Sequence, residues 1–127
     1  MHEKDLFEYA VIRVVPRVER EEFLNVGVVL YCARQKFLKM LYKIDVPRLK
    51  ALCNECDADS VNEYLQAFHR VCVGGSDAGP IGRLSMAERF RWLTATRSTV
   101  VQTSKVHPGF CENAGETLDK LFVQLVE

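Results

Sequence analysis

Four residues whose side chains can bind metals lie close together in the middle of the sequence. Cys53 and Cys56 are separated by two residues, and His69 and Cys72 follow with the same spacing. Three thiolates and one imidazole form a ligand set that tetrahedral Zn²⁺ accepts. On helices, however, Cys53 and Cys72 fall within apolar stripes, whereas His69 lies off the stripe that holds Cys72. The pattern therefore favours buried thiols, and we expect neither a metal nor another cofactor.

The Cys-x-x-Cys spacing of Cys53 and Cys56 also occurs in thioredoxin-like redox sites. Such sites lie at the start of a helix, where the helix dipole lowers the pKa of the thiol. Here the two cysteines follow the end of a predicted helix, so the sequence argues against redox chemistry. The chain has five cysteines, an odd number, and its first residues lack the features of a signal peptide. We therefore expect a cytoplasmic protein with reduced thiols.

No motif in the sequence combines a nucleophile, a base and an orienting acid in a way that indicates catalysis. Ser76 lies in Gly-Gly-Ser-Asp-Ala, which lacks the second glycine of a nucleophile elbow. The glycine-rich segment 74–83 lacks the Lys-Ser or Lys-Thr ending of a phosphate-binding P-loop. Asp57 and Asp59 precede a predicted helix, where carboxylates stabilise the helix end without a metal. These observations favour a non-catalytic protein over an enzyme, and we assign no catalytic residue.

Polar residues also interrupt segments that otherwise have the composition of β-strands. Buried polar groups must be paired, so these residues either face water at a plain sheet edge or form a binding network. A guanidinium can bind a phosphate or carboxylate, and hydroxyl groups can orient it, which predicts an anion-binding groove beneath segment 74–83. Arg13 could instead form an ion pair with Glu21 or Glu22. The candidate ligand-binding residues are Arg13, Asn25, Arg97, Ser98, Gln102 and Ser104.

The charge balance restricts the classes of partner. The chain has 17 basic and 17 acidic side chains, so it has no net field that attracts nucleic acid or an anionic membrane. No segment approaches the roughly 18 consecutive apolar residues that a membrane span requires. A local basic cluster between residues 34 and 50 could contact RNA or a phosphorylated partner, but lysines on an edge strand more often protect it from aggregation. We therefore expect no membrane contact, and binding to nucleic acid is disfavoured.

The elements that must position these residues follow from the apolar periodicity. Segments 7–15, 23–32 and 37–43 are rich in β-branched and aromatic residues or alternate in polarity, which predicts three strands. Their short connections require an antiparallel arrangement. Gly27 inside the second strand indicates a bulge or the close approach of another backbone. A fourth strand is predicted over 98–106, followed by a turn at His107-Pro108-Gly109.

Four helices are predicted, because a capping residue precedes an apolar stripe at four places. The caps are Asp45, Ser60, Ser85 and Asn113. Segment 74–83, with four glycines and one proline, is expected to be an exposed, mobile loop. The order β-β-β-α-α-α-β-α predicts an α+β fold, an antiparallel sheet of about four strands with helices packed on one face. A length of 127 residues fits a single domain, residues 1–127.

Five strings in the chain occur together in a characteristic order. They are Tyr9-Ala-Val-Ile-Arg13, Asn25-Val-Gly27-Val-Val-Leu, Gly79-Pro-Ile-Gly, Glu88-Arg-Phe-Arg-Trp92-Leu and Arg97-Ser-Thr-Val-Val-Gln102. In these strings the chain resembles the bacterial family known as domain of unknown function 3037, and the resemblance covers nearly the whole chain. It implies a small bacterial protein with no established activity. It also implies a protein partner, a HipA-like kinase, because members are encoded near such kinases.

Two hypotheses about function therefore stand. The first is a non-catalytic interaction or regulatory module that acts through a protein partner. The second is a small enzyme or binder of a phosphorylated or carboxylate metabolite. An exposed apolar patch would favour the first, and a concave pocket lined by the candidate residues would favour the second.

Overall fold

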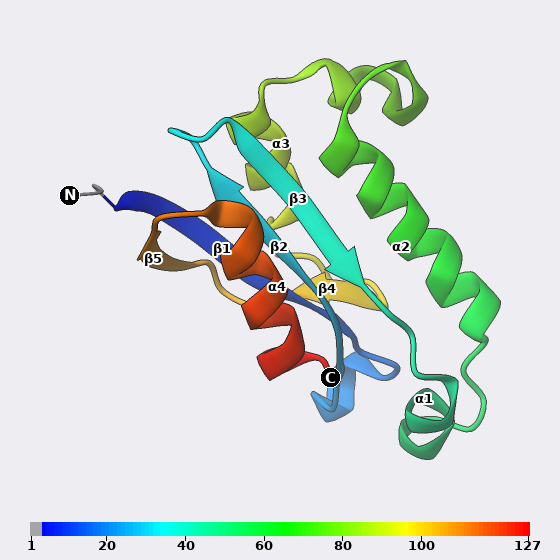
Figure 1. Cartoon of the computed structure of the whole chain (residues 1–127). Coiled ribbons are helices and arrows are strands. Elements are labelled where there is room, and N and C mark those ends of the chain that lie inside the picture. The colour runs from blue at the N-terminus through cyan, green and yellow to red at the C-terminus, as the bar shows by residue number, and fades with distance from the viewer. Residues whose placement is uncertain (1–3) are drawn as a thin grey trace.

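The computed structural model describes residues 4–127 and contains an antiparallel sheet of five strands (Figure 1). The strands follow the order β3-β2-β1-β4 along the sheet, and β5 also pairs with β1. The predicted α+β class with an antiparallel sheet is thereby confirmed. The strands are β1 Asp5–Val14, β2 Leu24–Cys32, β3 Phe37–Tyr42, β4 Val101–Thr103 and β5 His107–Cys111.

Two short strands share the edge of β1 that faces away from β2. β5 pairs with the first half of β1, and β4 pairs with its last three residues. Between them, the N–H of Ser104 donates to the carbonyl of Val11 at 2.8 Å. The Ser104 hydroxyl in turn accepts a hydrogen bond from the Val11 N–H at 2.9 Å. The edge of β1 therefore stays hydrogen-bonded across the break between the two strands.

The predicted turn at His107-Pro108-Gly109 is wrong, because these residues belong to β5. The predicted strand over 98–106 is correspondingly shortened to β4. Pro108 lacks an N–H, which an edge strand tolerates. Gly109 lies opposite Phe7, and a Cβ atom at Gly109 would lie 2.5 Å from the Phe7 ring. Residues that are typical of turns thus form an edge strand, because an aromatic ring from the neighbouring strand covers the glycine.

Gly27 lies at a bulge in β2, where the third strand also comes close. The register of β1 and β2 shifts after the pair Ile12–Gly27, so that Val26 is left as the extra residue. A Cβ atom at Gly27 would lie 2.6 Å from the carbonyl oxygen of Leu41 in β3. Both features that the sequence predicts for this glycine, the bulge and the close approach, are confirmed.

The helices begin largely where the capping residues predict. The helices are α1 Val46–Leu52, α2 Ala58–Val73, α3 Met86–Leu93 and α4 Ala114–Leu125. The side chains of Asp45, Ser85 and Asn113 each accept a hydrogen bond from a backbone N–H in the first turn. The predicted cap of α2 at Ser60 is wrong, since α2 begins earlier and is capped by Asp57. The Ser60 hydroxyl donates to the Asp57 carboxylate instead, at 2.9 Å.

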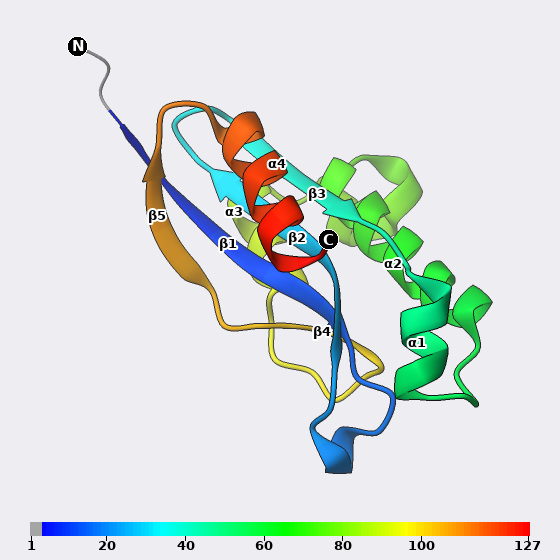
Figure 2. The ribbon, with the colours of Figure 1, turned by 60° about the horizontal axis from the view of Figure 1, so that its bottom comes forward.

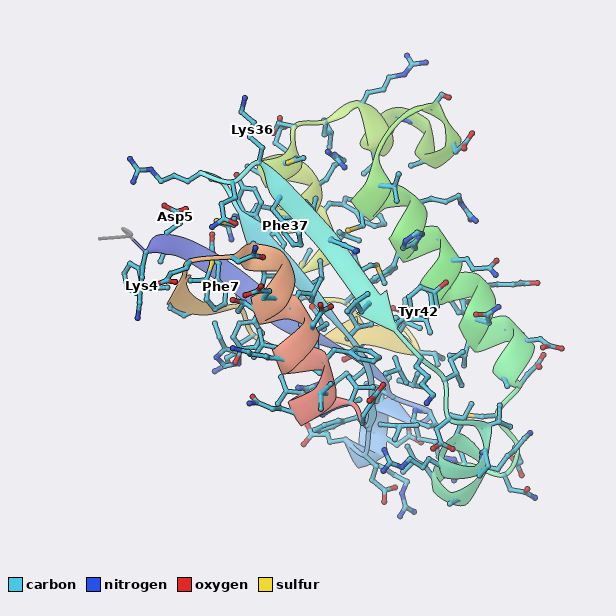
Figure 3. All side chains as sticks on the ribbon, in the orientation of Figure 1. Lys4, Asp5, Phe7, Lys36, Phe37 and Tyr42 are labelled. Carbon is cyan, nitrogen blue, oxygen red and sulfur yellow. The ribbon has the colours of Figure 1, made fainter. Side chains whose placement is uncertain are left out.

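Helices cover both faces of the sheet, in contrast to the predicted packing on one face (Figures 1 and 2). Helices α1, α2 and α3 pack over a cluster that includes Ile12 and Val29. Helix α4 packs on the other face, over a cluster that includes Val28 and Leu30. Phe7 and Phe37, labelled in Figure 3, belong to this second cluster. Because β2 is apolar on both sides, it requires cover on both sides.

The glycine-rich segment 74–83 is exposed at several residues, as the sequence predicts, but most of it forms a short helical segment instead of a loop. Residues Ser76–Arg83 form the 3-10 segment η2, which the hydrogen bond from the Gly75 N–H to the Gly82 carbonyl closes at 2.8 Å. Below it, Arg89 of α3 is 8% exposed and donates to the Val71 and Cys72 carbonyls at the end of α2. The start of the segment, at Gly74, therefore packs against a buried arginine.

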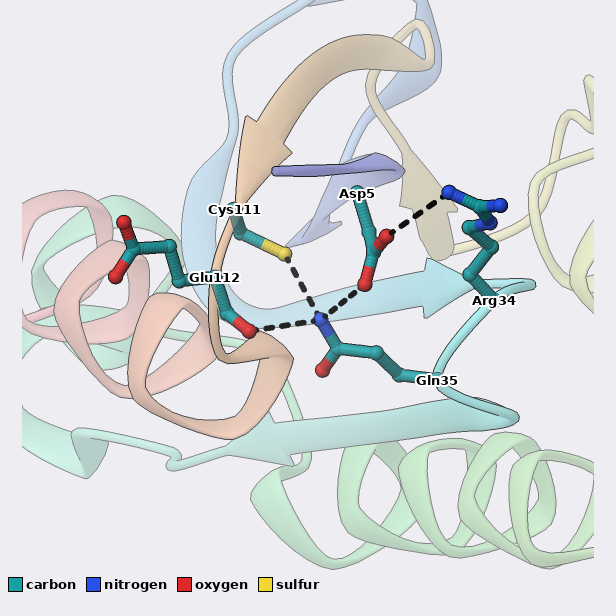
Figure 4. Close-up of polar contacts among 5 residues, drawn as sticks. All are labelled: Asp5, Arg34, Gln35, Cys111 and Glu112. Atoms are coloured by element: carbon teal, nitrogen blue, oxygen red, sulfur yellow. Dashed lines mark hydrogen bonds and ion pairs between the residues drawn. The ribbon is translucent and has the colours of Figure 1, made fainter. Parts of the chain in front are cut away.

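Gln35, in the turn between β2 and β3, joins three elements at one end of the sheet (Figure 4). Its Nε2 donates to the Asp5 carboxylate and to the Glu112 carbonyl, both at 3.0 Å. Its Oε1 accepts from the N–H of Ala114, the first residue of α4, at 2.9 Å. One side chain thus fixes the start of β1 and the start of α4 to the same turn.

Candidate functional site

Two open hollows are lined by residues 15–23, the connection between β1 and β2 at the lower end of Figure 2, and a third lies beside Leu24 and Asn25 at the start of β2. This connection contains the 3-10 helix η1, Val18–Arg20. Glu21 follows with φ of 56°, in the left-handed region that residues other than glycine rarely adopt. The hollow beside α1 measures about 450 Å³, the one beside the end of α4 about 240 Å³ and the one over β1 and β4 about 340 Å³.

Three of the six candidate ligand-binding residues form one row across the sheet. Arg13 of β1 pairs with Asn25 of β2 on one side and with Gln102 of β4 on the other. Residues paired directly across antiparallel strands project from the same face of a sheet. Arg13 and Gln102 line the hollow of about 340 Å³, together with Val15, Val18, Glu21 and Phe23. We call this hollow the Arg13 hollow.

The Arg13 guanidinium lies flat on an aromatic ring, with one nitrogen unpaired. Its central carbon is 4.0 Å from the centre of the Phe23 ring. Its Nε is buried and has no hydrogen-bond partner within residues 4–127. Burial lowers the pKa of Arg13 from its ordinary value. The predicted ion pair with Glu21 or Glu22 is wrong, since within the described chain Glu22 pairs with Arg20 and Arg13 forms no ion pair.

Asn25, the neighbour of Arg13 in the row, binds the end of α4 through its amide nitrogen, whereas its amide oxygen is unpaired among the described residues. Its Nδ2 donates to the Leu125 carbonyl at 3.1 Å. Its Oδ1 is buried and finds no donor in the part of the chain that the structure describes. Two neighbouring strands thus present one unpaired donor, on Arg13, and one unpaired acceptor, on Asn25.

A family model described as "Protein of unknown function (DUF3037)" matches residues 9–126. The chain belongs to the DUF3037 family. The resemblance seen in the sequence strings is thereby confirmed, and the match includes Arg13, Asn25 and Gln102. No curated protein and no solved structure matches this chain. Family membership thus assigns no role to any residue of this DUF3037 protein.

The other candidate ligand-binding residues of this DUF3037 protein lie apart from the row. Arg97 stacks on the rings of Phe68 and Trp92, at 4.9 and 4.6 Å from their centres. Its guanidinium donates to the Leu93 and Trp92 carbonyls at 3.0 and 2.6 Å, which caps the end of α3. Burial lowers the pKa of Arg97. Its donors are therefore directed at the protein's own backbone.

Ser98 and Ser104 are also separated from the Arg13 hollow. Ser98 is exposed between α3 and β4. Ser104 is engaged with the backbone of β1, and its hydroxyl also donates to the Lys105 carbonyl at 2.9 Å. The structure therefore does not assemble the six candidates into one groove beneath segment 74–83, and a binding role for each remains a prediction.

The zinc alternative for Cys53, Cys56, His69 and Cys72 is wrong. Within residues 4–127, no three His, Cys, Asp or Glu side chains come together as a metal site requires. Cys72 is buried in the core, and burial raises its pKa to about 12. His69 is exposed on α2, with its ring 6.0 Å from that of Tyr42. The side chains of the two pairs, Cys53 with Cys56 and His69 with Cys72, therefore do not meet at one point.

The sequence analysis missed two functional candidates in the Arg13 hollow. Phe23 and Val18 are large apolar residues, yet they are 46% and 44% exposed. Phe23 was predicted as the first residue of the strand 23–32, but it directly follows the polar run Glu19 to Glu22, and β2 begins only at Leu24. The contrast between this polar run and the aromatic ring of Phe23 was the signal that the sequence offered.

Among the described residues, no helix is both long and apolar enough to cross a bilayer.

Proposed function

We propose that this DUF3037 protein is a non-catalytic interaction module that binds a protein partner at the Arg13 hollow. The observation that carries the proposal is the stack of Arg13 on Phe23, an exposed aromatic ring beneath a cation with an unpaired Nε. Arginine and aromatic side chains contribute most of the binding energy at protein interfaces. Val18 extends the apolar surface beside the ring.

The unpaired nitrogen of Arg13 indicates what the partner presents. The Nε of Arg13 requires an acceptor, and Arg13 lines the hollow, whereas Asn25 lines the separate hollow of about 240 Å³ beside the end of α4. An extended peptide segment supplies acceptors for Arg13, because carbonyl groups recur along its backbone. A buried polar atom left unpaired costs about 1–3 kcal/mol, so a partner that pairs the Nε of Arg13 gains that energy on binding. The remaining contact is an apolar side chain of the partner against Phe23 and Val18.

The partner that we propose is a HipA-like kinase, since the family resemblance implies that such kinases are encoded near members. The binding that we propose is regulatory, because the described residues that line the Arg13 hollow include no cysteine, serine or threonine nucleophile. The left-handed Glu21 supports a binding role for the connection between β1 and β2. Backbone strain of this kind is maintained at functional sites more often than elsewhere.

We expect Phe23→Ala to weaken binding of the purified kinase by about 30-fold, or about 2 kcal/mol, because it removes the ring on which Arg13 rests. Titration calorimetry measures this loss. Phe110→Ala is the matched control, since Phe110 is also an exposed phenylalanine, 68% exposed, but lies on β5 away from the hollow. Equal affinities of Phe23→Ala and the wild-type protein would contradict the site, and no binding by the wild-type protein would contradict the partner.

A phosphorylated or carboxylate metabolite is the second candidate, because Arg13 and Gln102 face the same hollow of about 340 Å³. This volume falls within the range of about 300–1,000 Å³ that is usual for small-ligand sites. If this candidate holds, inorganic phosphate or succinate raises the melting temperature of the wild-type protein and leaves that of Arg13→Met unchanged. Equal responses of the two proteins exclude the Arg13 hollow as the anion site.

A further inference from the structure

The hollow beside α1 contains an accessible pair of thiols. Of the five cysteines, Cys32, Cys72 and Cys111 are buried, whereas Cys53 and Cys56 are half-buried. The buried thiols that the sequence predicts are therefore confirmed for Cys72 but not for Cys53 and Cys56. Cys53 lines the hollow of about 450 Å³, and Cys56 packs against the main hydrophobic cluster. Cys53 thus opens onto the hollow, whereas Cys56 contacts the hydrophobic core.

A tight turn holds the two cysteines together. Cys53 is the residue at which α1 ends, and its N–H donates to the Leu49 carbonyl at 2.8 Å. The N–H of Cys56 then donates to the Cys53 carbonyl at 3.2 Å. The ammonium group of Lys50 donates to the Cys56 carbonyl at 2.7 Å. A turn closed in this way keeps its first and last Cα atoms within about 7 Å, close to the range that a disulfide spans.

The environment divides the two thiols into different roles. A hydrogen bond from Cys56 lowers the pKa of Cys53, with further help from backbone N–H groups and the charge of Arg17. Burial raises the pKa of Cys56 to about 11, and its hydrogen bond to Cys53 acts in the same direction. The sequence disfavoured redox chemistry because no helix dipole could stabilise a thiolate at this position. In the structure, the neighbouring thiol of Cys56 stabilises the Cys53 thiolate instead. Cys53 is therefore the better nucleophile of the pair.

From the turn that joins the two residues and the opening of Cys53 onto the hollow, we propose that Cys53 and Cys56 form a redox-active dithiol that reacts with low-molecular-weight disulfides of the glutathione type. The hollow supplies a cation for the carboxylates of such a disulfide. Arg17 lies at its rim with 55% of its side chain exposed, 3.8 Å from Glu55.

The reaction is two successive thiol–disulfide exchanges. The Cys53 thiolate attacks one sulfur of oxidised glutathione, the disulfide bond of the oxidant breaks, and one glutathione thiolate leaves. Cys56 then transfers its proton to solvent and attacks the Cys53 sulfur of the mixed disulfide, which expels the second glutathione as a thiolate. Two protein thiols are oxidised to one disulfide, and one molecule of oxidised glutathione is reduced to two thiols.

The test uses the full chain, reduced and then incubated with excess oxidised glutathione. Mass spectrometry after alkylation should find a disulfide within the peptide that carries Cys53 and Cys56, with the other three thiols alkylated. Cys56→Ser should accumulate one glutathione on Cys53, because the resolving thiol is absent. Cys53→Ser should form adducts at least about tenfold more slowly, since the remaining thiol has the higher pKa. Circular dichroism confirms that each variant is folded.

Cys72→Ala is the control and should react as the wild-type protein does, because Cys72 is buried. Five free thiols after the incubation would overturn the proposal. A disulfide that joins other cysteines, or a glutathione adduct on Cys56 that forms as fast in Cys53→Ser as on Cys53 in Cys56→Ser, would overturn it as well.

Discussion

Replacement of Arg89 by methionine should lower the free energy of unfolding by about 4 kcal/mol, the largest effect that we expect from a single substitution. Arg89 is 8% exposed and donates to the Val71 and Cys72 carbonyls, at 3.2 and 2.7 Å, and to the Leu84 carbonyl at 3.1 Å. Methionine fills much of the same volume but leaves buried acceptors unpaired at the end of α2. The positive charge of Arg89 also interacts favourably with the negative end of the α2 dipole, and methionine removes this stabilisation as well.

Urea unfolding followed by circular dichroism measures the effect, as a fall in the midpoint concentration. Arg91→Met provides the matched control on the same helix. Arg91 forms an ion pair with Glu8 at 2.8 Å, but its side chain is 57% exposed, so the loss should stay below about 1 kcal/mol. Similar losses for the two variants would show that the buried hydrogen bonds of Arg89 do not support the structure.

Gly27→Ala should lower the free energy of unfolding by about 3 kcal/mol, although it adds only one methyl group. The added Cβ atom would lie 2.6 Å from the Leu41 carbonyl oxygen and 3.0 Å from the Cβ atom of Tyr42. The nearer of these is a backbone atom of β3, which no side-chain rotation can move away. β2 and β3 must therefore separate at the bulge, where the pairing with β1 already changes register.

Gly115→Ala is the control for this substitution. Gly115 lies in the first turn of α4, and an added Cβ atom would find its nearest neighbour, Asn113 Oδ1, at 3.4 Å. Alanine favours the helical conformation over glycine, so the variant should equal or slightly exceed the wild-type stability. Thermal unfolding of both variants compares the two sites directly. A wild-type melting temperature for Gly27→Ala would show that the β2–β3 edge opens at little cost.

The sequence predicted best those features that depend on neighbouring residues. The first three strands and the caps at Asp45, Ser85 and Asn113 follow from local periodicity and side-chain hydrogen bonds, and the structure contains them. The packing of α4 on the second face could not be predicted from α4 itself, because its apolar stripe fits either face. The decisive information lay in β2, whose apolar residues alternate between both faces.

The candidate site was predicted in part for a similar reason. Arg13, Asn25 and Gln102 come together because strand pairing aligns them, which required the correct neighbours for β1. Arg97 was assigned to a groove, but its position four residues after Leu93 allows it to cap α3, and arginine commonly binds the last carbonyls of a helix. That local signal was present in the sequence. The contact between Cys53 and Cys56 depends on the turn that connects α1 and α2, which the Cys-x-x-Cys spacing alone does not specify.

The position of β1 at the centre of the sheet has a consequence for synthesis of the protein. The ribosome makes β1 before β5, yet β5 completes the edge of β1, where Cys111 pairs with Asp5. Contacts between segments so distant in sequence form slowly, and only after both have left the ribosome. Until β5 has been made, the growing chain therefore carries a central strand with one open edge, a state in which chaperones bind and neighbouring chains aggregate.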